Sequence, residues 1–177
     1  MPTALRFALA TALVVALSAC DTSFSEGGDF QCRDGATASG TIGGRAFRAD
    51  CVEVGDGDGA LFFGAYQGYG DADGEPTPGQ PFGSFRVSIE SASTGTYSIT
   101  SSGATTLDYF YSPGDDVDDR TTDVTSTATS GEVALTSVTA ERFEGSLTFS
   151  GPERVGADGG TSTGETVTGS VTFSIPR

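Results

Sequence analysis

The chain of 177 residues contains no histidine, tryptophan, lysine or asparagine. Without histidine it cannot build a Ser-His-Asp triad, a Cys-His pair or a histidine-ligated metal centre. The missing tryptophan removes the ring on which proteins most often stack sugars. Cysteine occurs three times, which, in the absence of histidine, is a poor basis for a zinc site.

The charge of the chain is strongly one-sided. Nine basic residues stand against 24 acidic ones, and the formal net charge is −15. Nucleic-acid phosphates require Lys and Arg, so this balance argues against nucleic acid as a partner. It also argues against direct contact with an anionic membrane surface. Two interpretations remain: the acidic residues keep an exported domain solvated, or they bind cations.

The first 20 residues have the pattern of an export signal. Residues 1–6 carry one basic residue, and residues 7–17 form an apolar run that is too short for a membrane span of ~20 residues. The run ends in Leu-Ser-Ala-Cys at residues 17–20. This motif resembles the lipobox of bacterial lipoproteins, in which cleavage occurs before the cysteine and acyl chains such as palmitate are attached to it. The resemblance implies lipidation of Cys20, and an ordinary secretory signal is the alternative.

Cleavage before Cys20 divides the chain into three parts. Residues 1–19 are the expected signal peptide, residues 20–36 a polar tether and residues 37–177 a single domain. We expect the mature protein to be exported and lipid-anchored to the membrane, on the periplasmic face or the cell surface. With Cys20 lipidated, Cys32 and Cys51 remain as a pair, which in an exported protein predicts a disulfide worth about 3 kcal/mol of stability.

Alternating apolar residues predict an all-β domain. Period-two patterns recur throughout, for example at Phe85, Val87 and Ile89, and no segment beyond the signal peptide has a helical period. Glycine is abundant at 26 residues, and Gly-Gly at residues 43–44 predicts a tight hairpin. We expect an antiparallel β-sandwich or flattened β-barrel of roughly 8–10 strands.

Further patterns concern the last strands and the loops. Gly-Ser-Leu-Thr-Phe-Ser at residues 145–150 recurs as Gly-Ser-Val-Thr-Phe-Ser at residues 169–174. Because two copies do not make a repeat protein, we interpret them as neighbouring antiparallel strands whose phenylalanines lie in one core layer. Polar stretches predict surface loops at residues 70–83, 112–123 and 151–164.

Four short motifs, taken in order, carry a resemblance to a known family. They are Ser-Gly-Thr-Ile-Gly-Gly-Arg-Ala-Phe-Arg-Ala at residues 39–49, Gly-Thr-Tyr at 95–97, Phe-Glu-Gly-Ser-Leu-Thr-Phe at 143–149, and the closing strand at 167–175. Together they resemble small all-β lipoproteins of Bacteroidota-type bacteria that carry a domain of unknown function. The departure is Phe47, because the first hairpin lacks the tryptophan of that pattern. The resemblance spans residues 37–177; it implies an exported all-β lipoprotein and supplies no catalytic residues.

Acidic loops supply the candidate metal ligands. Calcium is bound by several oxygen ligands, and these loops place carboxylates at alternate positions, although none of them fits an EF-hand. Solvated turns are the alternative interpretation. The candidate calcium ligands are Asp71, Asp73, Glu75, Asp115, Asp116, Asp118 and Asp119.

Other ligand sites have weaker signals. With 24 acidic residues, chance pairs of carboxylates are unavoidable, so no pair indicates a glycoside hydrolase. Phe62, Tyr66, Tyr69 and residues 109–111 lie beside predicted loops. Phe62 and Phe110 are expected to face away from their apolar neighbours. Such rings form either a contact patch or additional packing.

These observations favour a non-enzymatic, lipid-anchored envelope lipoprotein. We expect it to be a monomer that acts as a structural or binding module for an envelope protein or glycan. One alternative is a small-molecule or glycan binder with a cavity between its sheets, and another is a calcium-stabilised surface adhesion module. An enzyme ranks below these, because the sequence supplies no catalytic motif.

Calcium binding can be tested by thermal unfolding. If the acidic loops bind calcium, millimolar calcium raises the melting temperature, because a ligand that binds only the folded state stabilises it. A chelator should reverse the shift, and magnesium at equal concentration controls for ionic strength. An unchanged melting temperature in calcium would contradict the calcium hypothesis.

Overall fold

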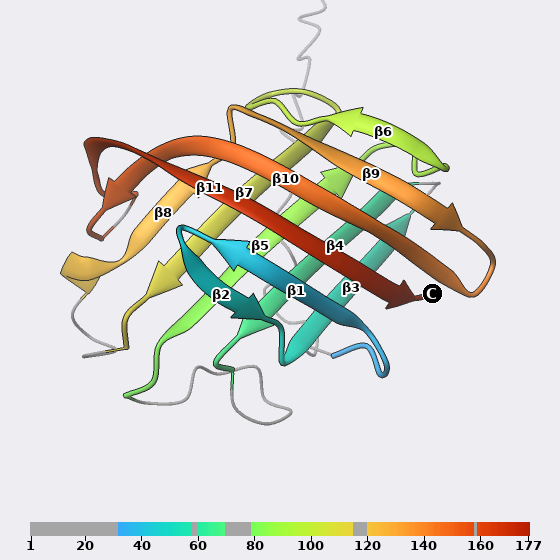
Figure 1. The fold of residues 1–177 in the computed structure, drawn as a ribbon, viewed down its shortest axis with the longest axis horizontal. Helices are drawn as coiled ribbons and strands as arrows, with labels where there is room; N and C mark the ends of the chain where they lie inside the picture. Colours follow the sequence, from blue (N-terminus) through green and yellow to red (C-terminus); the bar gives the residue numbers. More distant parts are fainter. Residues whose placement is uncertain (1–31, 58–59, 70–78, 115–119, 158) are drawn as a thin grey trace, which may run out of the picture.

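The computed structural model describes residues 32–57, 60–69, 79–114, 120–157 and 159–177. These residues form eleven strands and one 3₁₀ turn, η1 (Arg120–Thr122) (Figure 1). The strands are β1 (Thr37–Ile42), β2 (Arg45–Arg48), β3 (Cys51–Gly57), β4 (Ala60–Gln67), β5 (Phe82–Ile89), β6 (Gly95–Ser98), β7 (Thr105–Ser112), β8 (Val124–Thr127), β9 (Ser130–Val138), β10 (Arg142–Val155) and β11 (Thr161–Pro176). The expected all-β fold is confirmed, with one strand more than the upper end of the expected range. Within the described residues, no helix is long and apolar enough to cross a membrane.

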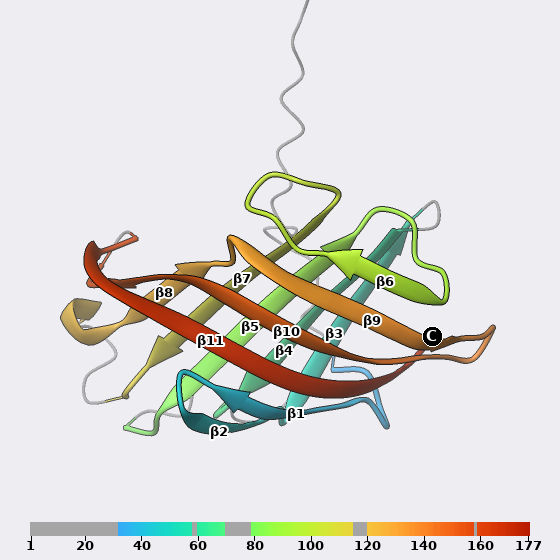
Figure 2. The same ribbon diagram turned by 45° about the horizontal axis from the view of Figure 1, so that its top comes forward.

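The strands form one antiparallel sheet that curls into a half-barrel. Its path runs β2-β1-β11-β10-β8-β7-β5-β4-β3, with β9 paired to β10 and β6 to β9. Figures 1 and 2 show a front layer (β2, β1, β11, β10, β9 and β6) that crosses a rear layer (β8, β7, β5, β4 and β3) at a steep angle. The layers are joined by β10, which pairs with β9 along its first part and with β8 at its end.

The core lies between the two layers and is built from alternate residues of their strands. Phe63 of β4 packs on Phe173 of β11 with ring centroids 4.9 Å apart, and Phe47 of β2 packs on Phe85 of β5 at 5.2 Å. Each pair joins one layer to the other. The predicted inward-facing residues Phe85, Val87 and Ile89 are all buried, which confirms the period-two pattern.

The repeated motif sets the register of the longest strand pair. Residues 145–150 lie in β10 and residues 169–174 in β11, which pair antiparallel as expected. Gly145 lies opposite Phe173 and Gly169 opposite Phe149, so each buried phenylalanine ring covers the glycine of the other strand. The glycines leave room for the rings, and the rings fill the space that a glycine leaves.

The predicted turns are partly confirmed. The β1–β2 hairpin turns at Gly43 and Gly44, whose φ angles of 57° and 73° suit the type I′ turn of a tight hairpin. The loop predicted over residues 151–164 is wrong at both ends, because β10 runs to Val155 and β11 begins at Thr161. Residues 161–166 are all exposed, so they have no buried face to produce an apolar alternation. Thr161, Ser162 and Thr166 pair with β10 through their backbone.

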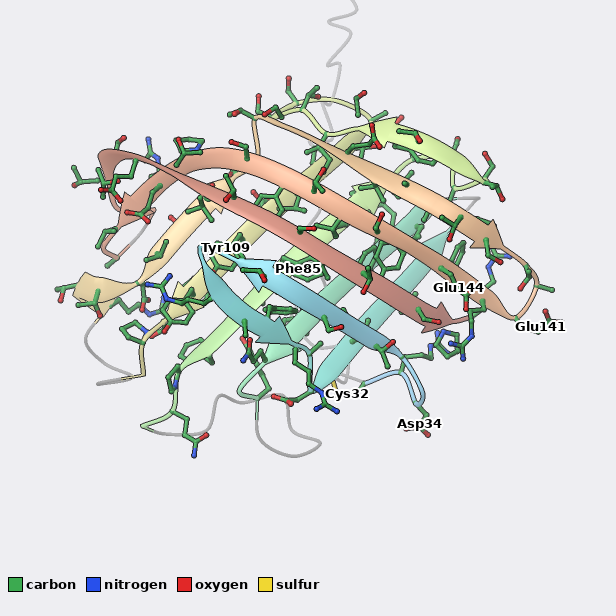
Figure 3. The ribbon with its side chains drawn as sticks, in the orientation of Figure 1. Cys32, Asp34, Phe85, Tyr109, Glu141 and Glu144 are labelled. Carbon is green, nitrogen blue, oxygen red and sulfur yellow. A yellow bond between two sulfur atoms is a disulfide. The ribbon has the colours of Figure 1, made fainter. Side chains whose placement is uncertain are left out.

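The predicted disulfide is confirmed. Cys32 and Cys51 are bonded with their Cα atoms 5.0 Å apart, and the Arg33 backbone N–H donates to the Val52 carbonyl at 2.8 Å. Cys51 begins β3, the last strand of the rear layer, whereas Cys32 precedes β1 of the front layer (Figure 3). The bond therefore fastens the start of the domain to the free edge of the rear layer.

The reciprocal glycine–phenylalanine packing predicts a stability difference between two glycines. A Cβ added at Gly169 would collide with the buried Phe149 ring, whereas one added at Gly55 of β3 would meet only Phe62 Cβ at 3.8 Å. Gly169→Ala should therefore destabilise the protein by about 1–3 kcal/mol, the usual cost of overpacking a core, and Gly55→Ala should be close to neutral. Urea unfolding of both variants measures the difference, and equal stabilities would refute this account of the register.

Candidate functional site

The outer faces of the two layers differ in chemistry. Alternate exposed positions of β1, β10 and β11 carry mostly serine and threonine, so the outer face of the front layer is polar with few charges. The outer face of the rear layer carries aromatic rings, arginine and carboxylate side chains, and it is hollowed. This hollow, which we call the outer-face groove, is the main candidate site.

The outer-face groove has a volume of about 630 Å³ and lies over β5, β7, β8 and the end of β10. Its wall includes six side chains that bear on its chemistry: Tyr69, Arg86, Asp108, Phe110, Thr125 and Arg154. A volume of this size falls in the range of ~300–1,000 Å³ typical of small-molecule sites.

Strand register brings the side chains of the groove together. In one row across the sheet, Ser84 of β5 lies opposite Phe110 of β7, which lies opposite Thr125 of β8, which lies opposite Arg154 of β10. In the next row, Arg86 lies opposite Asp108, and Asp108 lies opposite Thr127. Because side chains alternate along a strand, both rows point away from the core.

Hydrogen bonds hold the charged side chains of the groove in place. The Thr127 hydroxyl donates to Asp108 Oδ1 at 2.7 Å. Arg154 Nη1 donates to the Gly159 and Gly160 carbonyls at 3.1 and 3.3 Å, which ties the tip of the β10–β11 hairpin to the groove wall. Burial raises the pKa of Tyr66 and of Tyr69, and the positive charge of Arg86 opposes this rise.

Aromatic rings form a continuous chain along one side of the groove. Ring centroids are 5.0 Å apart between Tyr66 and Tyr69, 5.9 Å between Tyr69 and Phe82, and 5.4 Å between Phe82 and Phe110. The expectation that Phe62 and Phe110 face away from their apolar neighbours is confirmed, because both are half-buried while Phe63 and Tyr109 are buried in the core. Packing therefore fixes most of these rings, while Tyr69 and Phe110 also line the groove.

Polar atoms at the start of β8 lack hydrogen-bond partners. Among the described residues, Asp123 Oδ1, Thr125 Oγ1 and Ser126 Oγ are buried with no hydrogen-bond partner. A buried polar group without a partner costs about 1–3 kcal/mol. Thr125 lies on the outer face and lines the groove, so its share of this cost falls within the candidate site, whereas the Ser126 side chain points to the opposite face, toward Gly151.

A second, smaller hollow lies where β2 faces β5 and β7. It has a volume of about 210 Å³, and its walls include Phe47, Phe82 and Tyr111. The Arg45 guanidinium lies over the Tyr111 ring, 4.4 Å from the ring centroid, in a cation–π contact. This hollow lies between the two layers, which is where the alternative of a small-molecule or glycan binder placed its cavity. The large buried residues of both layers pack into one core cluster beside it.

The structure describes some of the site residues that the sequence predicts. Cys20 and all seven candidate calcium ligands lie outside the described residues, and the described residues contain no group of three acidic or cysteine side chains that could hold a metal. The disulfide pair is brought together. Sequence reasoning missed Arg86, Asp108 and Thr125 as site residues. The alternation of Arg86 with Phe85 and Val87 did place Arg86 on the solvent-exposed face of its strand.

Comparison of the chain with protein-family models, curated proteins and solved structures finds no match. A function for the protein must therefore be inferred from the geometry of the groove and from the pattern of the first 20 residues.

The buried tyrosines predict a loss of stability at alkaline pH. Burial raises the pKa of Tyr66 and of Tyr109 to about 12, compared with about 10 in an unfolded chain. Between these pH values the unfolded chain has lost phenolic protons that the folded protein still holds. The free energy of unfolding should therefore be unaffected by these groups below pH ~10 and should fall as the pH rises from ~10 to ~12.

Urea unfolding at pH values on both sides of ~10 measures this loss. Tyr66→Phe removes one of the two groups, so the variant should lose less stability over the alkaline range than the unmodified protein. The attribution to burial would be wrong if both proteins lost the same amount.

Proposed function

We propose that the protein is a lipid-anchored, non-enzymatic binding protein of the bacterial cell envelope, and that the outer-face groove is its binding site. The observation that carries this proposal is the position of the groove relative to the tether. The disulfide at Cys51 lies on β3 at one edge of the rear layer, whereas the groove covers β5, β7 and β8 toward the other edge. A tether that enters through Cys32 would therefore attach at the edge of the rear layer away from the groove.

Support for the anchor comes from the lipobox-like residues 17–20 and from the disulfide. Disulfides persist in oxidising compartments such as the periplasm and the cell surface, which are the compartments where bacterial lipoproteins reside. From Cys20 to Cys32 the chain spans at most ~40 Å when fully extended. An anchor at Cys20 would thus hold the domain close to the membrane.

Support for binding rather than catalysis comes from the side chains in the groove. Asp108 is the one carboxylate that lines the groove among the described residues, whereas most glycoside hydrolases use two carboxylates on opposite sides of the bond that is cleaved. Its Oδ1 atom already accepts a hydrogen bond from Thr127. With no histidine in the chain, the groove has no imidazole base to activate a serine or threonine.

The alternative of a ligand cavity between the sheets is less favoured by size. The hollow at Phe47 and Tyr111 has about 210 Å³, which is below the ~300 Å³ at which typical small-molecule sites begin. The outer-face groove has about three times that volume. The geometry therefore favours a ligand bound on the outside of the sheet. A calcium-stabilised adhesion module remains a separate proposal, which is tested by thermal unfolding with and without calcium.

Mass spectrometry of the protein extracted from membranes tests the anchor. We expect the mature chain to begin at Cys20 and to carry two or three acyl chains, because two or more chains hold a protein stably on a bilayer. The Cys20→Ser variant should leave the membrane fraction, and it serves as the control. A mature chain that begins elsewhere or carries no lipid would contradict the proposal.

A further inference from the structure

We infer that the outer-face groove binds an uncharged oligosaccharide, with Phe110 as the stacking ring and the Arg86–Asp108 pair as hydrogen-bonding groups. This inference rests on the proposed function and gives the chemical class of its ligand. It also moves the expected ligand site from the space between the sheets to the outer face of the rear layer.

The first argument is the mixture of donors and acceptors in the groove. Arg86 offers only donors, Asp108 offers only acceptors when ionised, and the Thr125 hydroxyl offers both. Arg86 and Asp108 lie opposite each other on neighbouring strands, and Thr125 lies in the adjacent row of the same face, opposite Phe110. Each hydroxyl of a sugar both donates and accepts, and vicinal hydroxyls can bind a guanidinium and a carboxylate together.

The second argument is the Thr125 hydroxyl itself. Its oxygen is buried and has no hydrogen-bond partner among the described residues, and the residue lies in the wall of the groove. Rotation of the Thr125 side chain toward the groove would let a bound hydroxyl supply the missing partner and remove the cost of leaving the group unsatisfied. An apolar ligand would leave the hydroxyl without a hydrogen-bond partner.

The third argument is the aromatic surface. Phe110 is half-buried in the groove wall, and its ring is supported by Phe82 at 5.4 Å. A ring fixed in this way offers an apolar surface to the C–H face of a sugar at little entropic cost. Phenylalanine here takes the place of the tryptophan that the sequence lacks.

The shape and the charge of the groove favour an uncharged chain over a phosphate-rich ligand. The row from β5 to β10 crosses three strand spacings, or ~14 Å, which suits an oligomer more than a single small ion. Asp108 offsets one of the two arginine charges, and Arg154 is already bound to the hairpin tip. An anionic ligand would therefore meet a carboxylate as well as arginine.

Saturation-transfer NMR on the full chain in detergent micelles tests the inference. The probes are maltotetraose, cellotetraose, xylotetraose and chitotetraose, with trigalacturonate and inorganic phosphate as charged probes. We expect saturation transfer to at least one uncharged tetrasaccharide. Phe110→Ala and Asp108→Asn should each weaken its binding about tenfold, which corresponds to about 1.4 kcal/mol.

Phe62→Ala is the matched control, because Phe62 is also a half-buried phenylalanine on the outer face of a central strand but does not line the groove. It should change the dissociation constant less than twofold, and thermal melts of all variants should confirm that they fold. The inference is overturned if no uncharged tetrasaccharide binds, if only trigalacturonate or phosphate binds, or if Phe110→Ala and Phe62→Ala behave alike.

The same spectra separate the inference from the proposed function. New reducing-end signals would mean that the protein hydrolyses the sugar, which would overturn the non-enzymatic proposal while supporting a saccharide ligand. A lipidated Cys20 without saccharide binding would overturn the inference and leave the anchor in place.

Discussion

The pairing of β10 with β11 is the contact on which the rest of the fold depends. It is the longest strand pair, and Phe149 and Phe173 each cover the glycine opposite to them. From this pair the front layer extends through β1 on one side and β9 on the other, and the end of β10 begins the rear layer at β8. A slip of one residue in either strand would turn the phenylalanine of that strand from the core to the solvent.

The groove is a consequence of the way in which β10 changes layers. The register of β10 against β11 shifts between Pro152 and Arg154, where one residue of β10 lies opposite three of β11. Such an irregularity bends the strand pair and also accommodates a proline that cannot donate to the ladder. After this irregularity, Arg154 pairs with Thr125 of β8. The bend thus brings the β10–β11 hairpin tip beside the outer face of the rear layer, where it forms one wall of the groove.

Sequence reasoning predicted the features that depend on neighbouring residues. These were the β class, the Gly43–Gly44 hairpin, the pairing of the two similar strands and the disulfide. It could not predict that Arg86 lies opposite Asp108, because β5 and β7 pair although β6 lies between them along the chain. It also missed the first part of β11, because residues 161–166 are exposed and leave no apolar pattern.

The use of arginine explains how so acidic a chain can still present a specific polar site. Arg45 stacks on Tyr111 and Arg177 on Phe143, Arg142 donates to Ser174, and Arg154 holds two carbonyls of the hairpin tip. These guanidinium groups clamp rings and turns, so they do not form a basic surface. Long-range attraction by a net charge of −15 cannot recruit an anionic or an uncharged ligand. Recognition of the ligand that we propose would therefore depend on short-range contacts, and the groove around Arg86, Asp108 and Phe110 offers them within the described residues.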